Sequence, residues 1–169
     1  MGFPWDSDQV RIRPLTPADY AAVLALNETA TGLVDPLGLD RLDWLRLIAA
    51  HAVVVEQDTR PIGFVLTFTP GSAFDGLEFN WFTTTYADRF LYIDRIVIDA
   101  AFRRQGVATA VYRAIERAAH PFDRAVTHHR THTPDPAAQA FHQSRAYTPL
   151  TTHHRPDATE VTLLSKDLV

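Results

Sequence analysis

The segment Leu91-Tyr-Ile-Asp-Arg-Ile-Val-Ile-Asp-Ala-Ala-Phe-Arg-Arg-Gln-Gly-Val-Ala-Thr109 decides the fold. Its first half is apolar enough for a central strand, which we place at residues 90–98. A short basic turn follows and leads into a helix expected over residues 105–119. The first backbone N–H groups of a helix have no partner within it, and the helix dipole makes that end positive. A cationic, glycine-bearing turn at this point therefore predicts a phosphate or pyrophosphate site.

The rest of the chain alternates strand and helix patterns. We expect an α/β fold with a mixed central sheet of about six to seven strands flanked by about four helices, in the order β-α-α-β-β-β-α-β-α-β-β. Thr16 and Asp40 are suitable N-caps for the first two helices. An aromatic segment, 76–88, is expected to be irregular. Further strands are predicted at 10–13, 52–56, 62–69, 124–131, 147–153 and 160–167, and the other helices at 16–32, 40–49 and 136–144.

Composition limits the class of protein. A length of 169 residues fits a single domain, 1–169, with a substantial core. No apolar run approaches the roughly 18 residues of a membrane span, and the first six residues lack a secretory signal, so we expect a cytoplasmic protein without a membrane partner. A net charge of −4 argues against nucleic acid as a partner. The absence of cysteine excludes an enzyme thiol as nucleophile.

A strand, an R-x-x-G-x-A turn and a long helix in this order resemble the coenzyme-A-binding motif of the GNAT superfamily of N-acetyltransferases. The order of elements matches as well, so the resemblance covers nearly the whole chain. It implies acetyl-CoA as cosubstrate, with a bulged strand that splays from its neighbour and binds the pantetheine arm, and with the turn amides around the pyrophosphate. The residues implied in holding the coenzyme are Ile96, Val97, Ile98, Arg103, Arg104, Gln105, Gly106, Val107, Ala108 and Thr109.

This motif departs from the family pattern at two positions. Arg104 stands where the family prefers glycine, and Ala108 replaces the commoner second glycine. The alternative for the whole segment is an ordinary turn glycine flanked by solvated arginines, because short motifs recur by chance. The strand before the turn and the helix after it favour the coenzyme site.

Acetyl transfer from a thioester needs a neutral amine, a polarised carbonyl and a proton for the leaving thiolate. The family usually supplies that proton from the tyrosine of F-Y-x-x-x-G-F. Here the segment is Phe141-His-Gln-Ser-Arg-Ala-Tyr147, so His142 takes the place of the tyrosine. We therefore predict His142 as the acid. The alternative is a histidine that lines the tunnel without transferring a proton.

Asp94 lies on the predicted central strand, near the position where related enzymes often place an acidic base. Along a regular strand it shares a face with Tyr92 and Ile96, unless a bulge shifts the register. We predict Asp94 as the second catalytic residue, either as a base or as the carboxylate that holds a cationic substrate. The alternative is a buried ion pair with one of three arginines, Arg89, Arg95 or Arg130.

The stretch Tyr92-Ile-Asp-Arg-Ile-Val97, followed later by a Phe-His pair, is similar to an uncharacterised bacterial subgroup of this family. The element Asn80-Trp-Phe82 matches that subgroup too, whereas Thr131 stands where the subgroup tends to carry asparagine. We predict Asn80, Trp81 and Tyr92 as acceptor-binding residues. The alternative for the aromatic segment is core packing.

The expected activity is acetyl-CoA-dependent N-acetylation of a primary amine of a small molecule or peptide, by direct attack in a ternary complex. The alternative is a catalytically inactive CoA-binding regulatory or sensory domain. A homodimer formed through the last strands is compatible with the resemblance. No metal site is predicted, because an arginine separates two of the candidate ligands. The histidines considered for such a site are His128, His129, His132, His153 and His154.

Overall fold

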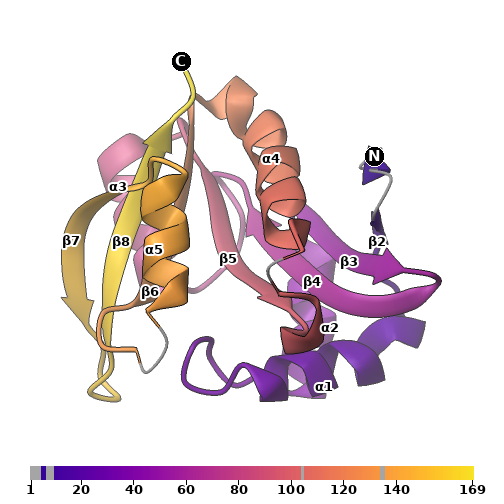
Figure 1. Cartoon of the computed structure of the whole chain (residues 1–169). Coiled ribbons are helices and arrows are strands. Elements are labelled where there is room, and N and C mark those ends of the chain that lie inside the picture. Colours follow the sequence, from indigo (N-terminus) through magenta and orange to yellow (C-terminus); the bar gives the residue numbers. More distant parts are fainter. Residues whose placement is uncertain (1–4, 7–9, 104, 134–135) are drawn as a thin grey trace.

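The computed structural model describes residues 5–6, 10–103, 105–133 and 136–169. Eight strands form one sheet in the spatial order β1-β2-β3-β4-β5-β6-β8-β7 (Figure 1). Neighbouring strands are antiparallel, except that β5 and β6 run parallel. The predicted α/β fold with a mixed sheet is confirmed. The strands are β1 Trp5–Asp6, β2 Arg11–Pro14, β3 His51–Gln57, β4 Arg60–Phe68, β5 Leu91–Ile98, β6 Arg124–Arg130, β7 Thr148–His154 and β8 Glu160–Asp167.

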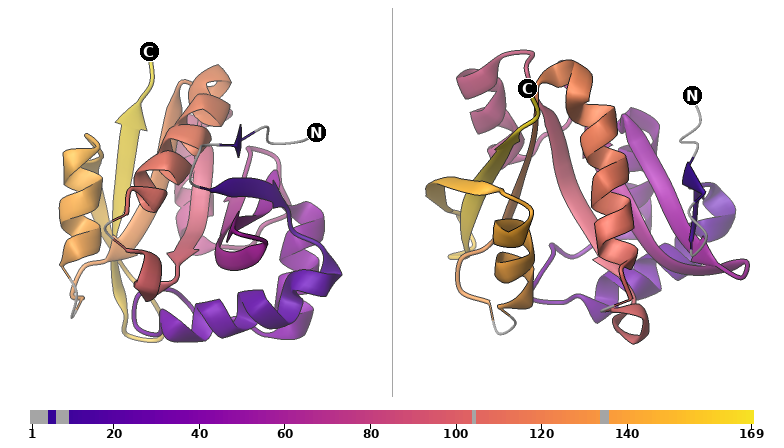
Figure 2. Two further views of the ribbon diagram at one scale, coloured as in Figure 1. Left: turned by 45° about the vertical axis from the view of Figure 1, so that its right-hand side comes forward. Right: turned by 45° about the horizontal axis from the view of Figure 1, so that its top comes forward.

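Helices cover both faces of this sheet (Figures 1 and 2). One apolar core lies between the sheet and α1, α2 and α3, and the other lies between the sheet and α4 and α5. Among the helices of the described residues, none has the length and apolarity that a membrane crossing requires. The helices are α1 Tyr20–Thr29, α2 Leu39–Ile48, α3 Leu77–Tyr86, α4 Val107–Ala119 and α5 Ala137–Ser144, with short 3-10 helices at Pro17–Asp19, Ala100–Phe102 and His120–Phe122.

Helix α3 lies in the aromatic segment that we expected to be irregular, and that expectation was wrong. Three consecutive threonines have low helix propensity, but the hydroxyl of each one donates to the carbonyl four residues earlier. Phe79 and Phe82 lie one turn apart on the buried face. Burial of these rings in the first core therefore outweighs the local preference for extended backbone.

One helix start differs from the sequence-based expectation, and the other agrees with it in its N-cap, Thr16. Gly38, not Asp40, is the N-cap of α2, and Asp40 lies in the first turn, where a carboxylate favours the helix dipole. A 3-10 turn at Pro17–Asp19 precedes α1, and the backbone N–H of Thr16 donates to the Asp19 carboxylate at 2.9 Å. The shifted start of α2 does not alter the order of elements.

Strands β5 and β6 diverge in the middle of the sheet (Figure 1). They pair at Leu91 with Ala125 and at Tyr92 with Val126, where the parallel ladder ends. Beyond it, the Thr127 hydroxyl reaches across to the Ile93 carbonyl at 2.9 Å. The edge of β5 that faces β6 therefore has no neighbouring strand over residues 94–98 of the described chain, and an opening passes through the sheet.

Candidate active site

A cavity of about 580 Å³ occupies the opening between β5 and β6. The cavity is lined by the α1–α2 connection, by β5, by the turn before α4 and the start of that helix, by the end of β6 and the connection that follows it, and by α5. Its walls are more apolar than polar, but carboxylate, guanidinium, imidazole and phenol groups all reach it. A largely apolar cavity with a few converging polar groups is the usual form of a small-molecule site.

The start of α4 forms one end of this cavity. Gly106 is the N-cap and has φ +79°, a left-handed conformation that glycine adopts without strain. The N–H groups of the first turn, which begins at Val107, have no acceptor within the helix. Gly106, Ala108, Thr109 and Arg103 line the cavity. This end can therefore hold an anionic group on backbone donors.

The structure brings most of the predicted coenzyme residues together. Ile96, Val97 and Ile98 line the cavity from β5. Gln105 is exposed and its side-chain amide donates to the Ala101 carbonyl at 3.4 Å, while the side chain of Val107 is buried in the second core. Arg104 lies outside the described residues.

A bulge on β5 sets the direction of Asp94. Thr67 pairs with Ile93 and Leu66 pairs with Arg95, so Asp94 is an extra residue without a partner on β4. The extra residue shifts the alternation of the strand. Tyr92 therefore lies in the first core, whereas Ile96 packs on the α4 side instead of sharing the face of Tyr92.

The side chain of Asp94 is buried and lines the cavity. Its Oδ2 accepts from Nε of Arg95 at 2.8 Å, and the two side chains are 6% and 7% exposed. The ion pair considered as the alternative is thus formed with Arg95. The other carboxylate oxygen, Oδ1, takes no hydrogen bond from the residues that the structure describes. Asp94 can therefore be both ion-paired and available to a ligand.

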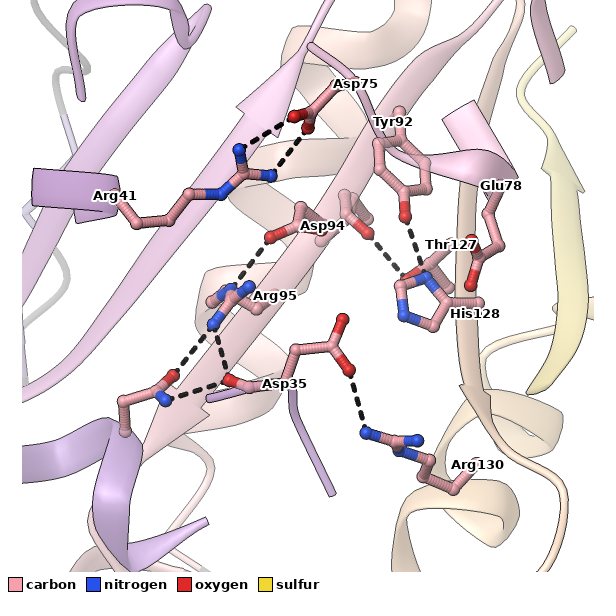
Figure 3. A network of polar contacts seen from close by, with 12 residues as sticks. Asp35, Arg41, Asp75, Glu78, Tyr92, Asp94, Arg95, Thr127, His128 and Arg130 are labelled. Carbon is pink, nitrogen blue, oxygen red and sulfur yellow. Dashed lines mark hydrogen bonds and ion pairs between the residues drawn. The ribbon is translucent and has the colours of Figure 1, made fainter. Parts of the chain in front are cut away.

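A network of charged groups surrounds the cavity on the α1 side (Figure 3). The carbonyl of Asp35 accepts from Asn27 and from Arg95, both at 3.0 Å. Its carboxylate accepts from Arg130 at 2.8 Å and from Arg155 at 2.6 Å. These contacts fix the α1–α2 connection beside the opening between β5 and β6, on the face of the sheet that α1 covers.

His128 and Tyr92 form a second polar pair on this face. Tyr92 Oη and His128 Nδ1 are 2.8 Å apart, and His128 also contacts Arg155, whose Nε donates to Glu78 at 2.7 Å. Burial lowers the pKa of His128 and raises that of Tyr92. His128 lines the cavity and Tyr92 lies directly behind it.

His142 lies on α5 at the opposite side of the opening. Its Nε2 is 2.7 Å from Oη of Tyr112, a residue of α4 that also lines the cavity. Its Nδ1 is buried and makes no well-formed hydrogen bond within the described chain. Burial, with the neighbouring His129 second, lowers the pKa of His142 to about 4. The imidazole is therefore neutral at neutral pH.

Asn80 and Trp81 lie away from the cavity. Asn80 is exposed on α3, and the Trp81 ring packs edge-to-face on Phe82 and His153. Neither residue is part of the cavity wall, whereas Tyr92 contacts it through His128. A contact of Asn80 or Trp81 with an acceptor stays a prediction.

The histidines considered for a metal site lie in different surroundings. His128 faces Tyr92, while the ring of His129 stacks on that of His142 with centroids 5.7 Å apart. His132 and His154 each approach Glu160 at the exposed end of the sheet. Within the described residues, no group of three or more such side chains is arranged to hold a metal ion.

Sequence reasoning did not select several residues that line or support the cavity: Asp35, Tyr112, Thr127 and Arg155. The sequence could have indicated Tyr112, because it follows the predicted coenzyme residue Thr109 by three positions and so lies on the same helix face. The others depend on long-range contacts and leave no local pattern.

Comparison with known proteins identifies the family. The model of the acetyltransferase (GNAT) family matches residues 21–147, well over half of the chain. The chain belongs to the GNAT acetyltransferase family. No curated protein is a significant match in sequence.

Solved structures share the GNAT fold at low sequence identity. Ard1 from Thermoplasma volcanium has a TM-score of 0.75 at 15% identity, covering 95% of this chain and 99% of its own. A Salmonella typhimurium protein described as an acetyltransferase, with its cofactor acetyl-CoA, has a TM-score of 0.67 at 15% identity, covering 95% of each chain. The NatC complex bound to Gag peptide and CoA gives 0.67 at 13% identity, covering 95% of this chain and 99% of that one.

Proposed function

We propose that this GNAT protein transfers the acetyl group of acetyl-CoA to a primary amine of a small molecule or peptide by direct attack in a ternary complex. One observation carries the proposal. The cavity runs through the β5–β6 opening and joins the free amides of α4 on one side to the Asp94 carboxylate on the other. Acetyl-CoA and the amine can thus enter from opposite faces of the sheet, and the amine can reach the thioester carbonyl carbon inside the opening.

The donor side has the features that coenzyme A requires. Residues 94–98 of β5 offer a backbone edge to which an extended pantetheine arm can add like a strand. The left-handed Gly106 turns the chain so that the first amides of α4 point to a pyrophosphate. Arg103 adds positive charge to the same wall. The Salmonella typhimurium relative with acetyl-CoA supports this assignment of the donor.

The acceptor side has an anionic group suited to an amine. Asp94 keeps one carboxylate oxygen available beside the opening, where it can hold an ammonium group and take up a proton, directly or through water. Arg95 holds that carboxylate in place through the ion pair between its Nε and Oδ2 of Asp94 at 2.8 Å. The relative bound to a peptide and CoA supports a peptide or similar amine as acceptor.

A second candidate is a CoA-binding domain without catalysis. It is favoured by His142, whose ring nitrogens are both buried and which is neutral at neutral pH. The two functions differ in a single observable, the release of free thiol from acetyl-CoA when an amine is present.

The test compares wild type with Asp94→Asn over a panel of amines and N-terminal peptides, with thiol release as the readout. We expect amine-dependent turnover by wild type, and a loss of turnover with unchanged CoA affinity in the variant. Tight CoA binding by wild type without thiol release for any amine would establish the second candidate instead.

A further inference from the structure

His142 alone does not explain how the leaving thiolate is protonated. Nε2 of His142 is engaged by Tyr112, and Nδ1 is buried. Because burial keeps this imidazole neutral, it has no readily released proton of its own. The residue in the family's acid position therefore needs a partner.

Tyr112 has the position that such a partner requires. It comes from α4, one turn after Thr109, and lines the cavity beside His142. The T-shaped contacts of its ring with Phe141 and Tyr147, with centroids 5.0 and 5.9 Å apart, hold the phenol in place. A phenol hydroxyl is thus available near the family's acid position, but from another helix.

We propose that Tyr112 donates the proton to the leaving thiolate, and that His142 is the positioning residue that directs the phenol. The proposal requires the tautomer in which Nε2–H of His142 donates to Oη of Tyr112, because this leaves the phenol O–H free to point into the cavity. The inference rests on the proposed acetyltransferase function, and it assigns a catalytic role to a residue outside the family motif.

The nitrogen of the neutral amine forms a bond to the thioester carbonyl carbon, and the carbon–sulfur bond breaks with its electron pair on sulfur. Sulfur takes the proton of the Tyr112 hydroxyl, and the phenolate regains a proton from water. The surplus proton of the amine leaves through Asp94 or water. The products are the amide and the free thiol of CoA.

Burial weakens the phenol as an acid, because it raises the pKa of Tyr112. A thiolate formed in the same desolvated cavity is a stronger base for the same reason. Burial thus makes the phenol a weaker acid and the thiolate a stronger base, so the two effects oppose each other in the proton transfer. A hydrogen bond from the phenol can stabilise the sulfur as its negative charge develops.

Tyr112→Phe removes only the hydroxyl, and Tyr147→Phe is its matched control. Tyr147 is also a buried tyrosine packed on His142, but its hydroxyl bonds to Glu116 at 3.2 Å and it is not part of the cavity wall. We expect Tyr112→Phe to lower kcat about 100-fold, as loss of a general acid typically does, with the KM for acetyl-CoA within about twofold of wild type. Tyr147→Phe should keep kcat within about threefold, even where its thermal unfolding midpoint falls.

Two further comparisons separate chemistry from structure. With 4-nitrophenyl thioacetate as donor, whose thiolate leaves without a proton, the defect of Tyr112→Phe should shrink to about threefold or less. His142→Gln keeps an N–H donor near the place of Nε2 and should retain kcat within about tenfold, whereas His142→Leu should fall as far as Tyr112→Phe.

The outcomes are distinct. A Tyr112→Phe variant as active as wild type, or one with the same defect for both donors, would overturn the role of Tyr112. Equal activities of His142→Gln and His142→Leu would overturn the role of His142. If wild type releases no thiol with any amine, the proposed function fails and Tyr112 has no reaction to assist.

Discussion

Mild acid should destabilise the protein through His142. Burial first, and the nearby His129 second, lower the pKa of this residue from 6.5 to about 4. In the unfolded chain the imidazole recovers its ordinary pKa, so between pH 6.5 and 4 the unfolded state binds the additional proton. The contribution of His142 to the free energy of unfolding is therefore fully present above about pH 6.5. It is lost as the pH falls toward 4.

The structure gives the size of the effect. Each pKa unit corresponds to about 1.4 kcal/mol, so the full difference is about 3 kcal/mol, of which about 2 kcal/mol is lost by pH 5. This is a large part of the 5–15 kcal/mol that stabilises a typical domain. At pH 5 most carboxylates are still ionised in the unfolded chain, so they contribute little to the change.

The assay is urea unfolding of wild type and His142→Gln at pH 7.5 and pH 5. Gln keeps polar hydrogen bonding toward Tyr112 but cannot take up a proton. His51, whose pKa burial lowers to about 4, is present in both proteins, and its contribution cancels in the comparison. We expect wild type to lose about 2 kcal/mol more than the variant on acidification. Equal losses would refute the burial of a neutral imidazole at this position.

Three further substitutions test other parts of the structure. Gly106→Glu places a carboxylate and a strained φ of +79° at the pyrophosphate end, so calorimetry should show CoA affinity lowered at least about tenfold, and unchanged affinity would count against this site. Asp94→Asn should lower kcat by about 100-fold without changing CoA affinity, and full thiol release by this variant would leave Asp94 a structural residue only. Gly63→Ala puts a Cβ within 2.6 Å of the Val97 carbonyl, so urea unfolding should show a loss of about 1–3 kcal/mol, whereas wild-type stability would contradict the close β4–β5 approach.

The strand-turn-helix at 91–109 was predictable because its information is local. An apolar strand, a glycine that can adopt positive φ and an amphipathic helix each leave a pattern in consecutive residues. The bulge at Asp94 leaves no such pattern. A single inserted residue changes which face every later side chain of β5 meets; the family resemblance implied a bulge in this strand, and the pairing with β4 shows that it lies at Asp94.

The rest of the cavity was less predictable because distant residues build it. Asp35 and Arg155 are 120 positions apart, and the Tyr112–His142 pair joins two helices across 30 positions. Ion pairs and hydrogen bonds of this kind depend on tertiary packing. Helix α3 shows the same limit, since the burial of Phe79 and Phe82 decides its conformation.

The measurement that tests the central claim most directly is amine-dependent release of free thiol from acetyl-CoA by the wild-type protein. The proposed function predicts turnover with at least one small or peptide amine and the appearance of an N-acetylated product by mass spectrometry. Saturable CoA binding with no thiol released above the uncatalysed rate, for any amine tested, would contradict it.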